Sequence, residues 1–162
     1  MFIRTKKIKN KEYAFLVDNK WDKKSKKVKQ KVIRYLGKVY KPKQENKNFI
    51  DFYNIESIEK YSKKDFKKII KDLIEFEIKT SELRNKVKLN YEKQELKING
   101  RNAVLKINQG YLCSYTIKNL LHFKKLPNEE EKQLGLRLAK SLVNAGIRIP
   151  KELFVRLCEK FF

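Results

Sequence analysis

Residues 12–39 read EYAFLVDNKWDKKSKKVKQKVIRYLGKV, two runs of aromatic and β-branched residues separated by the polar stretch DKKSKK at 22–27. Alternation of apolar and polar side chains over runs of this length is typical of strands that are half buried. In the first run, Tyr13, Phe15 and Val17 share one parity. The stretch predicts two strands of an antiparallel sheet, joined by a basic connection.

The second of these strands, expected at 28–39, divides into two faces. Val28, Val32 and Leu36 share one parity, whereas the other parity carries a lysine row followed by an aromatic residue, namely Lys27, Lys29, Lys31, Ile33 and Tyr35. Because successive side chains of a strand point to opposite faces, we expect the valine face to pack on apolar groups. The lysine face should meet solvent or a ligand.

The segment FIRTKKI at 2–8 predicts one more strand, connected to the next through a tight turn at Asn10-Lys11, since asparagine tolerates a positive φ. Residues 1–40 are therefore expected to form a three-stranded antiparallel sheet. An isolated sheet of this size is marginally stable in water. It should dock on the rest of the chain or on a ligand.

The stretch KPKQENKN at 41–48 contains Pro42 and no periodic apolar residues, so it is the predicted linker. A helix is expected at 63–83, where Ser62 and Asp65 resemble a capping box. Alternation over 86–98 and 102–108 around Asn99-Gly100 predicts a β-hairpin, and Gly110 is expected to end the sheet.

The last part of the chain predicts about three helices. Ser114 is expected to cap a helix over 115–124, and a second helix should run from 129, after Asn128, to Ala145-Gly146. Pro150 suits the first turn of a final helix. The predicted fold class is α+β, with a β-sheet module at 1–40, a linker at 41–48 and an α+β domain at 49–162.

The charge is high and unevenly distributed. The chain carries 41 Lys and Arg against 19 Asp and Glu, a formal net charge of +22. Residues 1–44 hold 16 basic and 3 acidic side chains, net +13, and residues 45–162 hold 25 and 16, net +9. A basic cluster of this kind is the electrostatic footprint of a nucleic-acid-binding protein. Nucleic acid is the predicted partner, with duplex DNA favoured and RNA as the alternative.

No catalytic or metal-binding pattern emerges from the sequence. Cys113, His122 and Cys158 lack the spacing of a zinc site, no glycine-rich phosphate loop is present, and the carboxylates follow no recognisable arrangement. We therefore expect a non-enzymatic protein without metal or cofactor. The absence of a signal-peptide pattern and of a long apolar run predicts a soluble, cytoplasmic protein without a membrane partner.

The predicted nucleic-acid-binding residues all lie in the β-sheet module. Phosphate contacts require Lys or Arg on an exposed surface, and a two-stranded ribbon with Gln, Arg or Lys side chains can reach base edges in the major groove. The candidates are Arg4, Lys6, Lys7, Lys9, Lys20, Trp21, Lys23, Lys24, Lys26, Lys27, Lys29, Gln30, Lys31 and Arg34. They suggest a role in transcription or chromosome maintenance.

Residues 2–38 match the pattern F-I-R-x-K-K-I-K-x-K-E-Y-x-x-L-V, followed by a basic loop and K-x-x-Q-K-V-I-x-Y-L-G-K. This pattern resembles the amino-terminal segment of insertion-sequence DDE transposases and the start of short archaeal proteins of unassigned function. The resemblance implies DNA contacts by Arg4, Lys6, Lys7, Lys29, Lys31 and Arg34. Residues 45–162 are too short for the catalytic core of such transposases, so the resemblance does not imply transposase chemistry.

Two other functions are compatible with the same sequence. An RNA- or ribosome-binding protein would stack unpaired bases on exposed aromatic residues such as Trp21, Tyr35 and Tyr40. A protein-interaction adaptor would instead bind a partner, or a second copy of the chain, through the C-terminal helices. Phe161 and Phe162 belong to the adaptor interface in that case, although packing into the core is the expected role of this aromatic pair.

Overall fold

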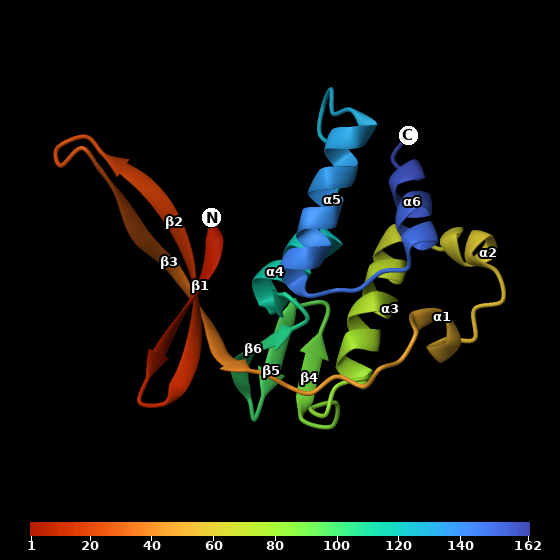
Figure 1. Ribbon diagram of the computed structural model, residues 1–162, viewed down its shortest axis with the longest axis horizontal. Helices are drawn as coiled ribbons and strands as arrows, with labels where there is room; N and C mark the ends of the chain where they lie inside the picture. Colours follow the sequence, from red (N-terminus) through yellow and green to blue (C-terminus); the bar gives the residue numbers. More distant parts are fainter.

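The computed structural model describes residues 1–162 and has an α+β fold. A long twisted meander of three strands, β1 (Phe2–Ile8), β2 (Lys11–Asp22) and β3 (Lys27–Tyr40), projects from a body of helices and shorter strands (Figure 1). β1 pairs antiparallel with β2, and β2 pairs antiparallel with β3. The predicted three-stranded antiparallel sheet is confirmed.

The turn between β1 and β2 is one residue earlier than predicted. Lys9 and Asn10, rather than Asn10 and Lys11, occupy the turn, with φ values of 46° and 61°. Two consecutive residues with positive φ match the twist of a two-residue hairpin. Asn10 therefore lies in the turn as predicted, but as the second rather than the first of its two residues.

The outer parts of β2 and β3 extend beyond the rest of the sheet. β1 pairs with β2 only as far as Val17, and β3 pairs with the body only through Lys38–Tyr40. Residues 17–32, called the basic ribbon here, are therefore two-stranded, and beyond the pairing of Val17 with Phe2 both edges are unpaired. The prediction that Val28 and Val32 pack on apolar groups is wrong, because each is 59% exposed on this projecting segment.

The body contributes four further strands to a mixed sheet. β3 runs parallel to β6 (Arg101–Ile107), which also pairs with β5 (Glu95–Ile98) and β7 (Gly110–Leu112), and β4 (Val87–Asn90) completes the order β1-β2-β3-β6-β5-β4. The predicted Asn99-Gly100 hairpin is confirmed, with φ values of 52° and 72°. Gly110 was expected to end the sheet, but it begins β7.

Gly37 permits the contact between the meander and the body. Its φ of 141° lies where L side chains are strained, and a Cβ there would approach the Asn102 carbonyl oxygen to 2.4 Å. β3 therefore comes close enough to pair with β6 only because this residue has no side chain. The following segment, 41–48, stays close to the body, since the Glu45 N–H donates to the Thr80 carbonyl oxygen at 2.8 Å.

The first three helices are α1 (Phe49–Phe52), α2 (Ile58–Ser62) and α3 (Phe66–Lys79). The predicted helix at 63–83 is thus shorter, and two small helices that the pattern did not indicate precede it. Asp65, not Ser62, caps α3, and its carboxylate accepts from the N–H groups of Lys67 and Lys68. Asp65 takes this role because its backbone is extended whereas Ser62 is already helical.

The C-terminal helices are α4 (Ser114–Leu121), α5 (Glu131–Ala145) and α6 (Lys151–Glu159). The predicted count of three is confirmed, and α5 ends at Gly146 in the left-handed conformation with a φ of 73°. The observed N-caps lie one or two residues from the predicted ones. Cys113 rather than Ser114 is the N-cap of α4, and Glu130 rather than Asn128 is the N-cap of α5. Pro150 directly precedes α6 as its N-cap.

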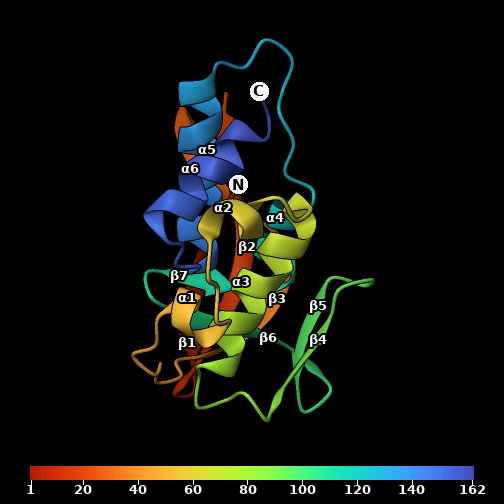
Figure 2. The same cartoon turned by 90° about the vertical axis from the view of Figure 1, so that its right-hand side faces the viewer.

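Two apolar clusters hold the fold together. The larger consists of 26 buried residues from α1 to α6, the body strands and the loops between them, with Phe161 packed against it. The expected packing of the aromatic pair is wrong for Phe162, which is 58% exposed. The smaller has six members at the junction of meander and body: Ala14, Leu16, Leu36, Val39, Val104 and Cys113. The meander is thus anchored by its inner half. In Figures 1 and 2 it lies on the side of the body away from α1, α2 and α6.

A buried carboxylate connects two parts of the body. The Glu77 side chain on α3 is fully buried, and its carboxylate accepts from the Arg148 backbone N–H at 2.9 Å and from the Arg148 guanidinium at 3.1 and 3.2 Å. These bonds connect α3 to the loop between α5 and α6. None of the helices has the length and apolar character needed to span a membrane.

Candidate nucleic-acid interface

The basic ribbon has two different faces. Directly paired residues of an antiparallel ribbon lie on the same face, and neighbouring pairs alternate. One face, called the lysine face, carries the pairs Asp18–Lys31, Lys20–Lys29 and Asp22–Lys27. The other, called the tryptophan face, carries the pairs Val17–Val32, Asn19–Gln30 and Trp21–Val28. Charge is therefore concentrated on one face of the ribbon.

Both carboxylates of the ribbon have local partners. Asp22 forms an ion pair with Lys29 and accepts a hydrogen bond from the Lys24 backbone N–H at 3.0 Å. The bond from Lys29 holds the pKa of Asp22 below its ordinary value. The Asp18 carboxylate lies 3.3 Å from the amino-terminal nitrogen. The acidic groups are thus already engaged.

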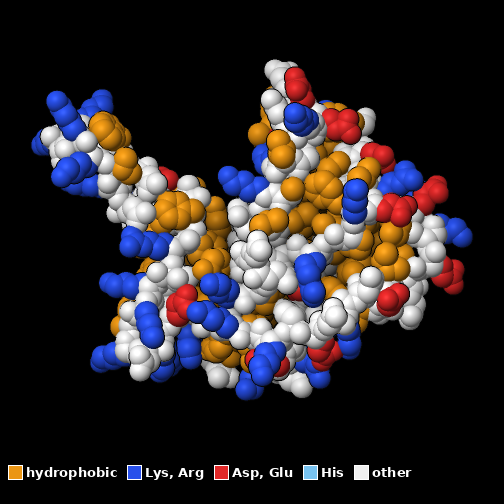
Figure 3. Space-filling view, in the orientation of Figure 1, with side chains coloured by type: hydrophobic (Ala, Val, Ile, Leu, Met, Phe, Trp, Pro, Cys, Tyr) orange, Lys and Arg blue, Asp and Glu red, His pale blue; other side chains and the backbone are white.

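Most lysines of the ribbon have no ion-pair partner. Lys20 and Lys29 face each other directly across the two strands, an arrangement of like charges that destabilises an isolated sheet. The turn adds Lys23, Lys24 and Lys26. Figure 3 shows that Lys and Arg side chains gather at the tip of the projection. Six exposed lysines lack an ion pair: Lys20, Lys23, Lys24, Lys26, Lys27 and Lys31. They present a concentrated positive charge to an incoming polyanion.

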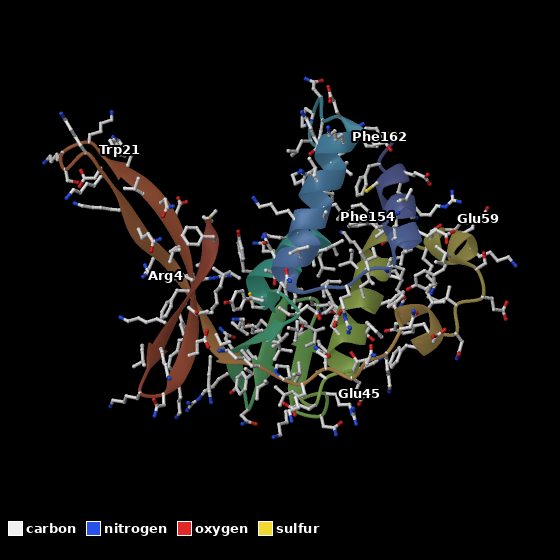
Figure 4. The ribbon with its side chains drawn as sticks, in the orientation of Figure 1. Arg4, Trp21, Glu45, Glu59, Phe154 and Phe162 are labelled. Atoms are coloured by element: carbon white, nitrogen blue, oxygen red, sulfur yellow. The ribbon has the colours of Figure 1, made fainter.

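A short polar network crosses the tryptophan face. The Arg4 guanidinium of β1 donates a hydrogen bond to Gln30 Oε1 of β3. The two side chains line a shallow hollow of about 370 Å³ whose apolar wall is formed by Phe15, Val17 and Val32. Figure 4 shows Arg4 at the inner end of the ribbon and Trp21 near its tip.

All fourteen residues predicted from the sequence are exposed, but they occupy three places. Lys20 to Lys31 lie on the ribbon, and Arg4 is connected to them through Gln30. Lys6 lines the same hollow as Arg4 and Gln30. Lys7 and Lys9 lie near or in the β1–β2 turn, at the opposite end of the meander from the tip of the ribbon. Arg34 lies at the foot of the ribbon, in a hollow of about 230 Å³ that Lys93 and Lys118 of the body also line.

The exposed aromatic residues differ in how freely they meet solvent. Trp21 is 61% exposed and has no aromatic neighbour. Tyr35 is 48% exposed, but its ring packs against Phe15 and Tyr13, with centroid distances of 5.5 and 6.3 Å. Tyr40 is half buried beneath the Lys38 ammonium, 4.8 Å from its ring. Trp21 is the free aromatic surface among the three.

The prediction that Tyr35 lies on the same face of β3 as the lysine row is wrong. Strict alternation assigns Tyr35 to the lysine row, yet it pairs with Phe15 and lies on the side of the tryptophan face. The register shifts between Ala14 and Phe15 and between Leu16 and Val17 explain the change. Each places one extra residue in β3 and so reverses the side on which the next residues project.

Three residues of the candidate interface were missed from the sequence. Asn19 opposes Gln30 on the ribbon, and Lys93 and Lys118 share the hollow with Arg34. A signal for Asn19 existed, since it shares the parity of Trp21 in β2. No local pattern connects Lys93 or Lys118 to Arg34, which lies 59 and 84 positions earlier in the chain.

Several polar groups of the body form hydrogen bonds or ion pairs with one another. The Tyr61 hydroxyl donates to Asp72 Oδ2 at 2.7 Å, and Lys68 lies 3.5 Å from Asp72 Oδ1. His122 is exposed at the end of α4, with Nδ1 3.0 Å from the Lys118 carbonyl oxygen. No three His, Cys, Asp or Glu side chains are grouped so that they could hold a metal ion. The positively charged projection is therefore the most distinctive surface.

Comparisons with protein-family models, with curated proteins and with solved structures find no match for this chain. The resemblance of residues 2–38 to the amino-terminal segment of DDE transposases stays a prediction.

Proposed function

We propose that this protein binds duplex DNA without catalysing a reaction, and that the basic ribbon makes the main contact. The observation that carries the proposal is the projecting two-stranded ribbon with six exposed lysines that lack ion pairs. Phosphate contacts of this kind supply most sequence-independent affinity for nucleic acids. A role in transcription or chromosome maintenance is consistent with such binding.

The shape of the ribbon favours a groove over a flat surface. The major groove of B-form DNA is about 12 Å wide and admits a two-stranded β-ribbon. Beyond Val17 the basic ribbon has no third strand on either edge, so it is narrow enough to enter. At its foot, Arg34, Lys93 and Lys118 extend the positive surface onto the body, where they can contact the flanking phosphates.

An RNA-binding function is the second candidate, and exposed Trp21 is the observation that favours it. A base can stack on a free indole ring, and single-stranded RNA is commonly recognised in this way. A stacking platform normally presents several aromatic rings, whereas Tyr35 and Tyr40 are engaged with neighbouring side chains. The ribbon thus supports groove binding better than stacking.

The test is fluorescence anisotropy with duplex DNA, duplex RNA and single-stranded RNA of equal length, titrated over a range of salt concentrations. We expect duplex DNA to bind best, with a slope of log K against log salt near −4 to −5 if about five lysines contact phosphates. The combined substitution Lys23→Gln, Lys24→Gln and Lys26→Gln should reduce the slope by about 2 to 3 and weaken binding more than tenfold.

The matched control removes the same charge from the body. Lys60, Lys63 and Lys67 are exposed and have no ion pair, and their combined substitution by glutamine should leave the slope almost unchanged. Equal losses in the two triple variants would show that the lysines act as a general coat and would refute the ribbon as the DNA contact. Tightest binding to single-stranded RNA, abolished by Trp21→Ala, would favour the second candidate.

A further inference from the structure

The tryptophan face of the ribbon is unsuited to phosphates and suited to base edges. Its six residues include no charged side chain, and the amides of Asn19 and Gln30 oppose each other at its centre. Apolar pairs flank them, Trp21 with Val28 toward the tip and Val17 with Val32 toward the foot. Of these four, Trp21, Val28 and Val32 are more than half exposed, so apolar surface without a partner lies beside the amides.

The lysine face is the poorer candidate for contact with the floor of a groove. Both acidic residues of the ribbon, Asp18 and Asp22, project from it. Carboxylates on the side facing the bases would be repelled by the phosphates and would lose their hydration. On a ribbon in the groove, the long lysine side chains can bend around both edges toward the phosphates, because their ammonium groups reach well beyond the backbone.

Arg4 is placed to orient the amide of Gln30. Its guanidinium donates to Gln30 Oε1, which fixes which end of the amide carries the oxygen. A carbonyl oxygen has two lone pairs, so Oε1 can accept a second hydrogen bond while the amide nitrogen donates. Adenine offers the matching groups in the major groove, a donor at N6 and an acceptor at N7.

We infer that the tryptophan face turns toward the floor of the major groove, where Asn19 and Gln30 read adenine and the exposed Trp21, Val28 and Val32 contact thymine methyl groups. The inference rests on the proposed binding of duplex DNA and adds a preference for A·T base pairs. Arg4 acts as a positioning residue. Same-face side chains lie ~7 Å apart along a strand, so three pairs cover about four base-pair steps.

The experiment uses the full chain and three duplexes of equal length with alternating A·T, G·C or inosine·cytosine pairs. Alternating sequences present the same base pairs in every register, so no specific site is needed. An inosine·cytosine pair resembles A·T in the minor groove, because it lacks the guanine amino group, but resembles G·C in the major groove. We expect A·T to bind about fivefold to a hundredfold tighter than both other duplexes.

Two double variants separate the faces. Asn19→Ala with Gln30→Ala should bring the affinity ratio of A·T to G·C close to one and leave the salt slope unchanged. The control pair Lys20→Ala with Lys31→Ala takes the neighbouring residue on each strand of the lysine face. It should preserve the ratio and lower the salt slope by about 2.

Several outcomes would overturn the inference. Equal binding of inosine·cytosine and A·T duplexes would place recognition in the minor groove, and an unchanged ratio in the amide variant would exclude Asn19 and Gln30 as readers. Either result leaves the proposed duplex binding intact. Failure of the unsubstituted protein to bind any of the duplexes would refute the proposed function together with the inference.

Discussion

The basic ribbon and the helical body are built from similar apolar residues and use them in opposite ways. In the body, leucine and isoleucine side chains of α3 are fully buried, whereas Trp21, Val28 and Val32 of the ribbon are more than half exposed. The ribbon is long because two strands continue past their neighbours, so its side chains have no second layer to cover them. Stability therefore resides in the body, and the ribbon is available for the DNA binding that we propose.

The largest expected effect tests this division directly. Leu73 is fully buried in the 26-residue cluster, and Leu73→Ala should lower the free energy of unfolding by about 3 kcal/mol because it leaves a cavity. Val28→Ala on the ribbon should change it by less than about 0.5 kcal/mol. Urea unfolding followed by far-ultraviolet circular dichroism measures both. Comparable losses would mean that the ribbon packs against something in solution.

A smaller effect is expected at the junction between the two regions. Gly37→Ala combines an unfavourable φ with a Cβ that would lie 2.4 Å from the Asn102 carbonyl oxygen, so β3 should move away from β6. We expect a loss of about 2 kcal/mol. Hydrogen exchange should show faster exchange at Lys38–Tyr40 and Ala103–Leu105.

The control for this substitution is Gly100→Ala, where a Cβ would meet no atom within 4 Å although φ is also positive, at 72°. Gly100→Ala therefore measures the cost of a positive φ without any steric contact of the new Cβ. If the two variants lost equal stability, the close approach of β3 to β6 would contribute nothing beyond the strain of the glycine conformation.

The smallest effect concerns acid stability of the body. Hydrogen bonds from Arg137, at 2.7 Å from both carboxylate oxygens, lower the pKa of Glu129 to about 2 from an ordinary value of 4.5. The charged carboxylate stabilises the fold, so its contribution is complete above pH 4.5 and is lost as the pH falls toward 2. Thermal unfolding of Glu129→Gln should therefore depend less on pH in this range.

Glu92→Gln serves as the comparison, because Glu92 is exposed and has no ion pair. Its thermal unfolding should follow the profile of the unsubstituted protein. If Glu129→Gln also kept that profile, the Arg137 pair would contribute no measurable stability. Glu129→Gln should not alter DNA binding, because Glu129 belongs neither to the ribbon nor to the hollow that Arg34 lines.

Local chemistry in the sequence determined much of the fold. Alternation predicted β1, β2 and β3 almost to the residue, Asn99-Gly100 predicted the hairpin of β5 and β6, and Gly146 predicted the end of α5. These signals are local because each depends on φ preferences or on side chains a few residues apart. The helix starts were less accurate, since several polar residues near each start are capable of capping.

For the candidate site, the sequence by itself determined that the amino-terminal quarter would be basic, extended and exposed. Only the tertiary structure decided which residues share a face. Extra residues at the two register shifts of β3 moved Tyr35 away from the lysine row, and pairing across the ribbon joined Asn19 to Gln30. Both depend on contacts between strands, which local periodicity does not contain, because register is fixed by the partner strand and by the body that anchors it.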